Sequence, residues 1–178
     1  MSNHDRADKI IAAWQRTRPD LDPSSVAIVT RVWQLARVFG AERRRLLAGE
    51  GIDPALMDLL GALRRQDPPH ALTTRELAEL EGITPAAISQ RLSRAEQKGW
   101  ITRDPQGDRS VLVTLTDAGQ AVADGVAAAI FDHDDTLLAV LDPAARRQLA
   151  ELLRTMCLHL TGDTPVDHVG TGKEFDTN

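Results

Sequence analysis

Apolar residues recur every three or four positions along most of the chain, which is the period of helices that bury one face. From this pattern we predict seven helices, over residues 5–18, 24–48, 54–63, 73–80, 84–99, 116–141 and 142–160. In the second helix, Trp33 and Phe39 fall on the apolar side and are expected in the core. The predicted fold class is therefore mostly α.

Two short stretches depart from the helical period. Residues 100–103 and 111–114 are rich in β-forming side chains, and turn-forming residues fill 104–108 between them. This arrangement predicts a short β-hairpin directly after the fifth helix. Residues 66–71 are expected to form a loop, and residues 161–178 hold too few apolar side chains to pack and are expected to be disordered.

Start and stop signals divide residues 73–99 into two helices. Thr73 and Glu76 have the spacing of a capping box, Gly82 permits a tight turn, and Thr84 followed by Pro85 begins the next helix. Two helices joined in this way have the spacing of a helix-turn-helix, whose second helix enters the major groove of DNA. The hairpin that follows would then be the wing of a winged helix-turn-helix.

The second helix of this pair has a polar outer face. At about 100° per residue, Ile88, Leu92 and Ala95 define its buried side, and Gln90 and Ser93 point away from them. Amide and hydroxyl groups can contact base edges, and an arginine on the flank suits a phosphate. The candidate DNA-binding residues are Thr84, Ala86, Ser89, Gln90, Ser93, Arg94, Gln97 and Lys98 in this helix and Arg109 in the hairpin. The alternative is a solvated polar face on an ordinary bundle helix.

The net charge of −5 at first sight argues against a DNA-binding protein. Residues 1–63 hold 9 Lys and Arg against 8 Asp and Glu, residues 64–113 hold 8 against 7, and residues 114–178 hold 4 against 11. Phosphate binding depends on where the basic residues lie and not on the total. We therefore expect the acidic last third to face away from DNA.

Other features narrow the functional class. No stretch is long and apolar enough to span a membrane, and the polar N-terminus is not that of a signal peptide. With Cys157 as its one cysteine the chain can form no internal disulfide, so we expect a cytoplasmic protein without a membrane partner. Cys157 has apolar neighbours and is expected to be a buried, unreactive thiol. Residues 132–135 read Asp-His-Asp-Asp, but consecutive helical residues cannot converge on one ion, so no metal or cofactor is expected.

Several short motifs then point to a family. Leu77–Leu80, Ile83–Thr84, Arg91–Leu92 and the run from Asp108 to Gly119 carry the pattern. They resemble the central signature of the MarR regulators (multiple antibiotic resistance type), over about residues 24–160. The resemblance implies a homodimer joined through its N- and C-terminal helices, with two winged lobes that bind palindromic double-stranded DNA. The wing looks short, and a single Asp108-Arg109 stands where the family often has an aspartate followed by two basic residues.

This resemblance divides the chain into four parts. Residues 1–48 would serve dimerisation and a ligand pocket, 53–115 would form the winged DNA-binding domain, 116–160 would dimerise, and 161–178 would be a disordered tail.

The N-terminal helix with its tryptophan is similar to one branch of the family, which binds urate and related aromatic anions and then releases DNA. The resemblance places the ligand residues at Trp14, Asp58, Arg91 and Arg103, with spacings of 33 and 12 between the last three. Independently, Arg91 lies only about 65° from the buried side of its helix, where an arginine needs a carboxylate or an anionic ligand. The alternative is a structural pair between Asp58 and Arg91, and Trp14 would then be a core or interface residue.

We therefore expect a DNA-binding transcriptional regulator, a repressor released from a palindromic operator by a small aromatic anion such as urate or a related purine. One alternative is a constitutive or redox-independent regulator without a ligand, and another is a non-catalytic dimeric protein-interaction module. An enzyme is not expected, because no catalytic motif was found.

Overall fold

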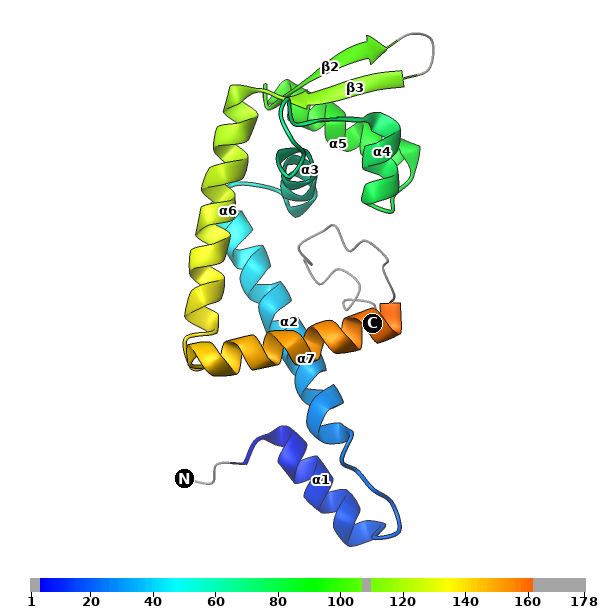
Figure 1. Ribbon diagram of the computed structural model, residues 1–178, viewed down its shortest axis with the longest axis vertical. Helices are drawn as coiled ribbons and strands as arrows, with labels where there is room; N and C mark the ends of the chain where they lie inside the picture. Colours follow the sequence, from blue (N-terminus) through cyan, green and yellow to red (C-terminus); the bar gives the residue numbers. More distant parts are fainter. Residues whose placement is uncertain (1–3, 107–109, 162–178) are drawn as a thin grey trace. The chain divides into compact units, whose positions relative to one another are not determined.

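The computed structural model describes residues 4–106 and 110–161 (Figure 1). The chain divides into two compact units, and their described parts are residues 4–44 and 45–161 without 107–109. The expected disordered tail lies outside the described residues, apart from Thr161, which is the last residue of a helix. None of the described helices is long and apolar enough to cross a membrane.

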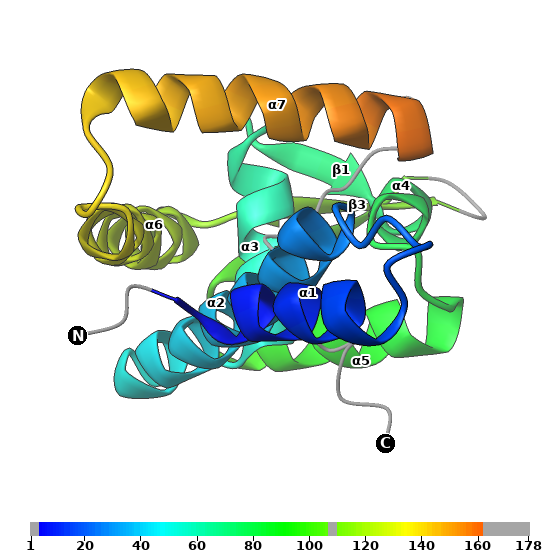
Figure 2. The same ribbon diagram turned by 90° about the horizontal axis from the view of Figure 1, so that it is seen from below.

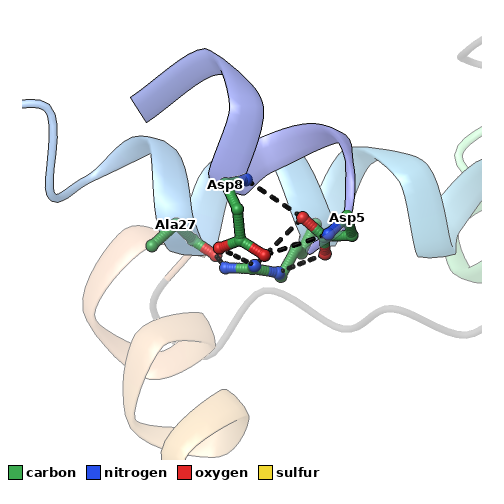
Figure 3. A network of polar contacts seen from close by, with 4 residues as sticks. Asp5, Asp8 and Ala27 are labelled. Carbon is green, nitrogen blue, oxygen red and sulfur yellow. Dashed lines mark hydrogen bonds and ion pairs between the residues drawn. The ribbon is translucent and has the colours of Figure 1, made fainter. Parts of the chain in front are cut away.

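The first unit contains α1 (Arg6–Thr17) and most of α2 (Val26–Gly49). Asp5 and Asp8 form a capping box at the start of α1, with N···O distances of 3.1 and 3.0 Å. Arg31 of α2 joins both carboxylates, with its Nε 2.8 Å from Asp5 and its Nη2 2.8 Å from Asp8, and also donates to the Ala27 carbonyl (Figure 3). The hydrogen bond from Arg31 lowers the pKa of Asp5. This cluster fastens the start of α1 to α2.

The apolar side of α2 is not the core of the chain. Trp33 is 54% exposed and Phe39 is 40% exposed, so the expectation that they are core residues is wrong for the single chain. Periodicity reports that a face is apolar but does not say which partner covers it.

The second unit holds the remaining elements. They are α3 (Pro54–Arg64), β1 (Ala71–Thr73), α4 (Thr74–Leu80), α5 (Pro85–Gln97), β2 (Ile101–Gln106), β3 (Ser110–Leu115), α6 (Asp117–Leu137) and α7 (Pro143–Thr161). The predicted helices are thus confirmed, with ends shifted by a few residues. The core of this unit joins the leucines of α3 to α4, α5, the sheet and the first two thirds of α6.

The small sheet has the order β1-β3-β2, and both pairings are antiparallel. Strand β1 was not predicted; in it Ala71 pairs with Thr114 and Thr73 with Leu112. The hairpin is also longer than predicted, because β2 continues to Gln106, which pairs with Ser110. Pro105 is tolerated in this extension because β2 is an edge strand.

The last two helices, α6 and α7, differ in how much of their surface the single chain buries. Buried side chains along α6 pack on the winged domain, whereas α7 has no buried residue in the single chain. Figure 2 looks nearly along the axis of α6 and shows α3 beside it. Asp142 caps α7 by accepting hydrogen bonds from the backbone N–H groups of Ala144 and Ala145.

Candidate functional site

The helix-turn-helix is held by local hydrogen bonds. The Thr73 N–H donates to Glu76 at 2.7 Å, and the Glu76 N–H donates to the Thr73 hydroxyl at 3.2 Å, which completes the expected capping box. The backbone bond from Thr73 lowers the pKa of Glu76. Gly82 takes a φ of +60° in the turn, a conformation that costs glycine little and other residues more.

The second helix, α5, begins at a second cap. The Thr84 hydroxyl accepts from the Ala87 N–H at 3.3 Å, and Pro85 occupies the first turn. The buried side of α5 consists of Ile88, Leu92 and Ala95, as predicted. Away from this buried side the candidate residues Thr84, Ala86, Ser89, Gln90, Gln97 and Lys98 are exposed. Ser93 is only half-exposed, so it lies closer to the core than the helical wheel indicated.

The basic candidates at this surface have partners in the free protein. Arg94 lies 3.5 Å from Asp53, the N-cap residue of α3, and both side chains are substantially exposed. Partial burial would raise the pKa of Asp53, but the Ala55 N–H and the charge of Arg94 outweigh it and lower that pKa. Lys98 lies over the ring of Trp100, 4.8 Å from its centroid. Since the Arg94 pair is long and exposed, exchanging it for a phosphate costs little.

At the base of the wing, the backbone that follows α5 lies close to the start of α6. The Thr116 N–H donates to the Trp100 carbonyl at 3.0 Å, and the Thr116 hydroxyl donates to the Gly99 carbonyl at 2.7 Å. Gly119 follows in α6, where an added Cβ would stand 1.9 Å from the Trp100 oxygen. The base of the wing is thereby fixed to α6, while the candidate residue Arg109 lies outside the described residues.

Two of the four candidate ligand residues form ion pairs with carboxylates of the helix-turn-helix. Arg91 pairs with Glu81, and the Arg91 side chain is 20% exposed while that of Glu81 is 4% exposed. Arg103 of β2 donates from its Nε to Glu96 of α5 at 2.9 Å. This bond lowers the pKa of Glu96 and raises that of Arg103. The expected need of Arg91 for a carboxylate is met by Glu81, whereas the partner suggested from the sequence was Asp58.

The other two candidates lie on α3 and α1. Asp58 is half-buried on α3 in the second unit. Trp14 belongs to α1 in the first unit and is 47% exposed. These placements leave their roles as predictions.

Two further expectations concern the last helices. Among the described residues, no group of three or more His, Cys, Asp or Glu side chains is arranged to hold a metal ion. Cys157 is exposed on α7, so the expectation of a buried thiol is wrong for the single chain.

Comparison with known proteins agrees with this geometry. Residues 50–110 match the MarR family. The chain is 26% identical over 165 residues to the HTH-type transcriptional regulator PecS of Dickeya dadantii (strain 3937). The matched region covers 92% of this chain and 99% of that protein.

Solved structures show the same fold. The structure of Sco3205, a MarR family transcriptional regulator from Streptomyces coelicolor, in complex with DNA has a TM-score of 0.62 and 25% identity, over 80% of this chain and 93% of the other. NadR in complex with 4-hydroxyphenylacetate has a TM-score of 0.55 and 21% identity, over 72% of this chain and 91% of the other. The curated relative and the DNA-bound structure are both described as transcriptional regulators.

Proposed function

We propose that this chain is a MarR-family winged helix-turn-helix regulator and that it binds palindromic double-stranded DNA as a homodimer through α5 and the wing. The observation that carries the proposal is the exposed polar face of α5. Ser89, Gln90 and Gln97 are exposed on this helix, and Thr84 caps its N-terminus. Glutamine can pair with adenine through two hydrogen bonds, and hydroxyls contact bases or phosphates. A solved relative in complex with DNA supports this reading.

The test is selection of bound duplexes from a random pool. The selected sites should be palindromic, with half-sites about one helical turn, or roughly 34 Å, apart. Gln90→Ala and Ser93→Ala should weaken specific binding by about 1–3 kcal/mol and relax base preference. Arg94→Ala should reduce the salt dependence of binding instead, because it removes a proposed phosphate contact. Unchanged base preference in the Gln90 and Ser93 variants would show that α5 does not read sequence.

The homodimer is proposed from the apolar faces that the single chain leaves open. On α7 an exposed apolar stripe with helical spacing consists of Leu149, Leu152, Leu153, Met156 and Leu160. On α2 the exposed apolar residues include Ile28, Val29, Val32, Trp33 and Phe39. Burial of such surface stabilises an interface by about 25 cal/mol for each Å². We expect these faces to be buried in an interface of more than about 2,000 Å², which is typical of obligate dimers.

We further propose that the regulator is a repressor that a small aromatic anion, urate or a related purine among the candidates, releases from DNA. Arg91 and Arg103 would bind the negative charge, and Asp58 and Trp14 complete the proposed ligand residues. Both arginines already pair with carboxylates, Glu81 and Glu96, so an anion would exchange for a group of the same charge. A solved structure of the same fold holds 4-hydroxyphenylacetate, an aromatic carboxylate.

Such an exchange offers a route to the DNA surface. Arg91 lies in α5, and its partner Glu81 closes α4, so a ligand that draws Arg91 away from Glu81 would loosen the two helices relative to each other. A small displacement of α5 spoils simultaneous contact with two half-sites. Binding reciprocity then requires DNA to weaken ligand affinity by the same factor, typically about 1–3 kcal/mol of coupling.

The ligand proposal is tested by titrating DNA complexes with urate, xanthine and 4-hydroxyphenylacetate. Arg91→Ala, Asp58→Asn and Trp14→Phe should each change the concentration at which an active compound releases DNA. If no compound releases DNA, or if all three variants respond as the wild type does, these residues are not the sensor. Arg91 and Glu81 then remain a structural pair.

A further inference from the structure

A polar cluster joins the winged domain to α6. Arg64, the last residue of α3, donates from its Nε to Asp124 at 2.7 Å and from its Nη2 to the other Asp124 oxygen at 3.1 Å. Asp124 lies in α6. The guanidinium and carboxylate thus meet through two parallel hydrogen bonds, an arrangement that fixes the relative orientation of its two groups. The hydrogen bond from Arg64 lowers the pKa of Asp124.

The same guanidinium reaches the segment that leads into the sheet. The Nη1 of Arg64 lies 3.3 Å from the Nε2 of His70. The His70 Nδ1 is 2.6 Å from the Gln66 carbonyl and must donate to it, so in the neutral ring Nε2 accepts from Arg64. The His70 carbonyl in turn accepts from the Leu115 N–H at the end of β3. Arg64, which belongs to α3, therefore contacts both α6 and the segment that leads into β1.

Apolar packing between α3 and α6 does not supply this constraint by itself. Leu59 and Leu63 share the core with Ala123 and Val126, but apolar contacts are non-directional and permit small rotations. A two-bond arginine–aspartate pair with a third contact resists such rotation.

We propose that Arg64, Asp124 and His70 set the angle of the winged domain on α6, and through it the half-site spacing that the dimer accepts. The inference rests on the proposed function, because it needs two winged domains on one dimer frame. A rotation at this joint displaces α5 along DNA whose steps are only about 3.4 Å apart, so a small change of angle is enough to alter which half-site spacing both winged domains can contact. Arg64 is thus a positioning residue, which acts on DNA without touching it.

The experiment measures spacing preference. Palindromic duplexes with the selected half-sites are made with the central spacer lengthened or shortened by one or two base pairs, and the affinity of the full-length protein is compared across the series. Arg64→Gln and Asp124→Asn should reduce discrimination between the best spacer and its neighbours by about fivefold or more. In these variants the affinity for the best spacer should fall only slightly. The affinity for the other spacers, relative to the best one, should rise by more than this fall.

Three further variants separate positioning from stability. Arg64→Lys keeps the charge but cannot engage both carboxylate oxygens, so it should lose part of the discrimination with little effect on folding. The charge swap Arg64→Asp with Asp124→Arg should restore much of it. Arg18→Gln is the matched control, because Arg18 makes an equivalent two-bond pair with Asp20 that joins no two helices. It should leave spacing preference unchanged.

The outcomes are distinguishable. Retained discrimination in Arg64→Gln and Asp124→Asn overturns the positioning role, as does a uniform loss of affinity on every spacer, which a lowered thermal midpoint would explain. A wild-type protein that selects no duplex overturns the proposed function, and this inference with it.

Discussion

Gly119 is the position at which a single added methyl group should matter most. Its Cβ would stand 1.9 Å from the Trp100 oxygen, 2.8 Å from the Trp100 carbonyl carbon and 3.1 Å from Leu115 Cδ2. Ordinary contact begins at 3.4 Å, so the start of α6 must move by about 1.5 Å from the backbone at Trp100. Because the obstructing atoms are backbone atoms, no change of side-chain rotamer relieves the contact.

The cost of Gly119→Ala follows from what this shift breaks. The two hydrogen bonds from Thr116 to the Trp100 and Gly99 carbonyls are worth about 1 kcal/mol each, and residual overpacking adds about 1–3 kcal/mol. Alanine recovers up to about 1 kcal/mol over glycine within a helix. We expect a net destabilisation of about 2–4 kcal/mol, which for a chain of this size is a fall of about 5–15 °C in the unfolding midpoint.

Urea and thermal unfolding at one fixed protein concentration measure the effect. Gly125→Ala is the matched control: Gly125 lies in the same helix, and nothing stands within 4 Å of its added Cβ. That variant should be stabilised by about 0.5–1 kcal/mol. Equal stability of the two variants would refute the close approach of α6 to the base of the wing.

Two further predictions concern ion pairs. Arg91→Ala removes the cation that pairs with Glu81, whose side chain is 4% exposed. Urea unfolding should show a destabilisation of about 1–3 kcal/mol. Adding Glu81→Gln should recover part of this loss. The pKa of Asp53 is lowered from its ordinary value of 3.8, so its contribution is fully present above that value and is lost as pH falls below it. Asp53→Asn should accordingly flatten the acid limb of stability against pH below about pH 4, and an unchanged limb would contradict this assignment.

The parts of the fold that the sequence predicted correctly are those with local causes. The α4–α5 unit depends on a capping box at Thr73, a positive φ at Gly82 and a Thr84-Pro85 start, each of which acts within four residues. Strand β1 has no such signal. It is three residues long and exists because Ala71–Thr73 pair with β3 some 40 residues later, a contact that alternation of side chains cannot reveal over so short a run.

The candidate site shows the same division. The buried side of α5 followed from periodicity, but Glu81 as the partner of Arg91 did not, because it lies in the turn and depends on how α4 and α5 pack. The exposed Trp33 and Phe39 show a second limit. An apolar helical face looks the same in sequence whether its own chain or a second chain covers it.

The two faces of α7 allow this ambiguity to be tested for the proposed dimer. Leu152 and Leu158 are nearly equally exposed in the single chain, at 58% and 56%. At about 100° per residue Leu152 lies in the apolar stripe with Leu149 and Met156, whereas Leu158 lies on the opposite side of the helix. If the stripe is the dimer interface, Leu152→Glu buries a carboxylate among apolar side chains and should dissociate the dimer, lowering DNA affinity with it. Leu158→Glu makes the same chemical change on the other face and should leave both properties unchanged. Sedimentation equilibrium over a range of concentrations measures the association directly. If the two variants associate equally well, the stripe is not the part of α7 on which association of the dimer depends.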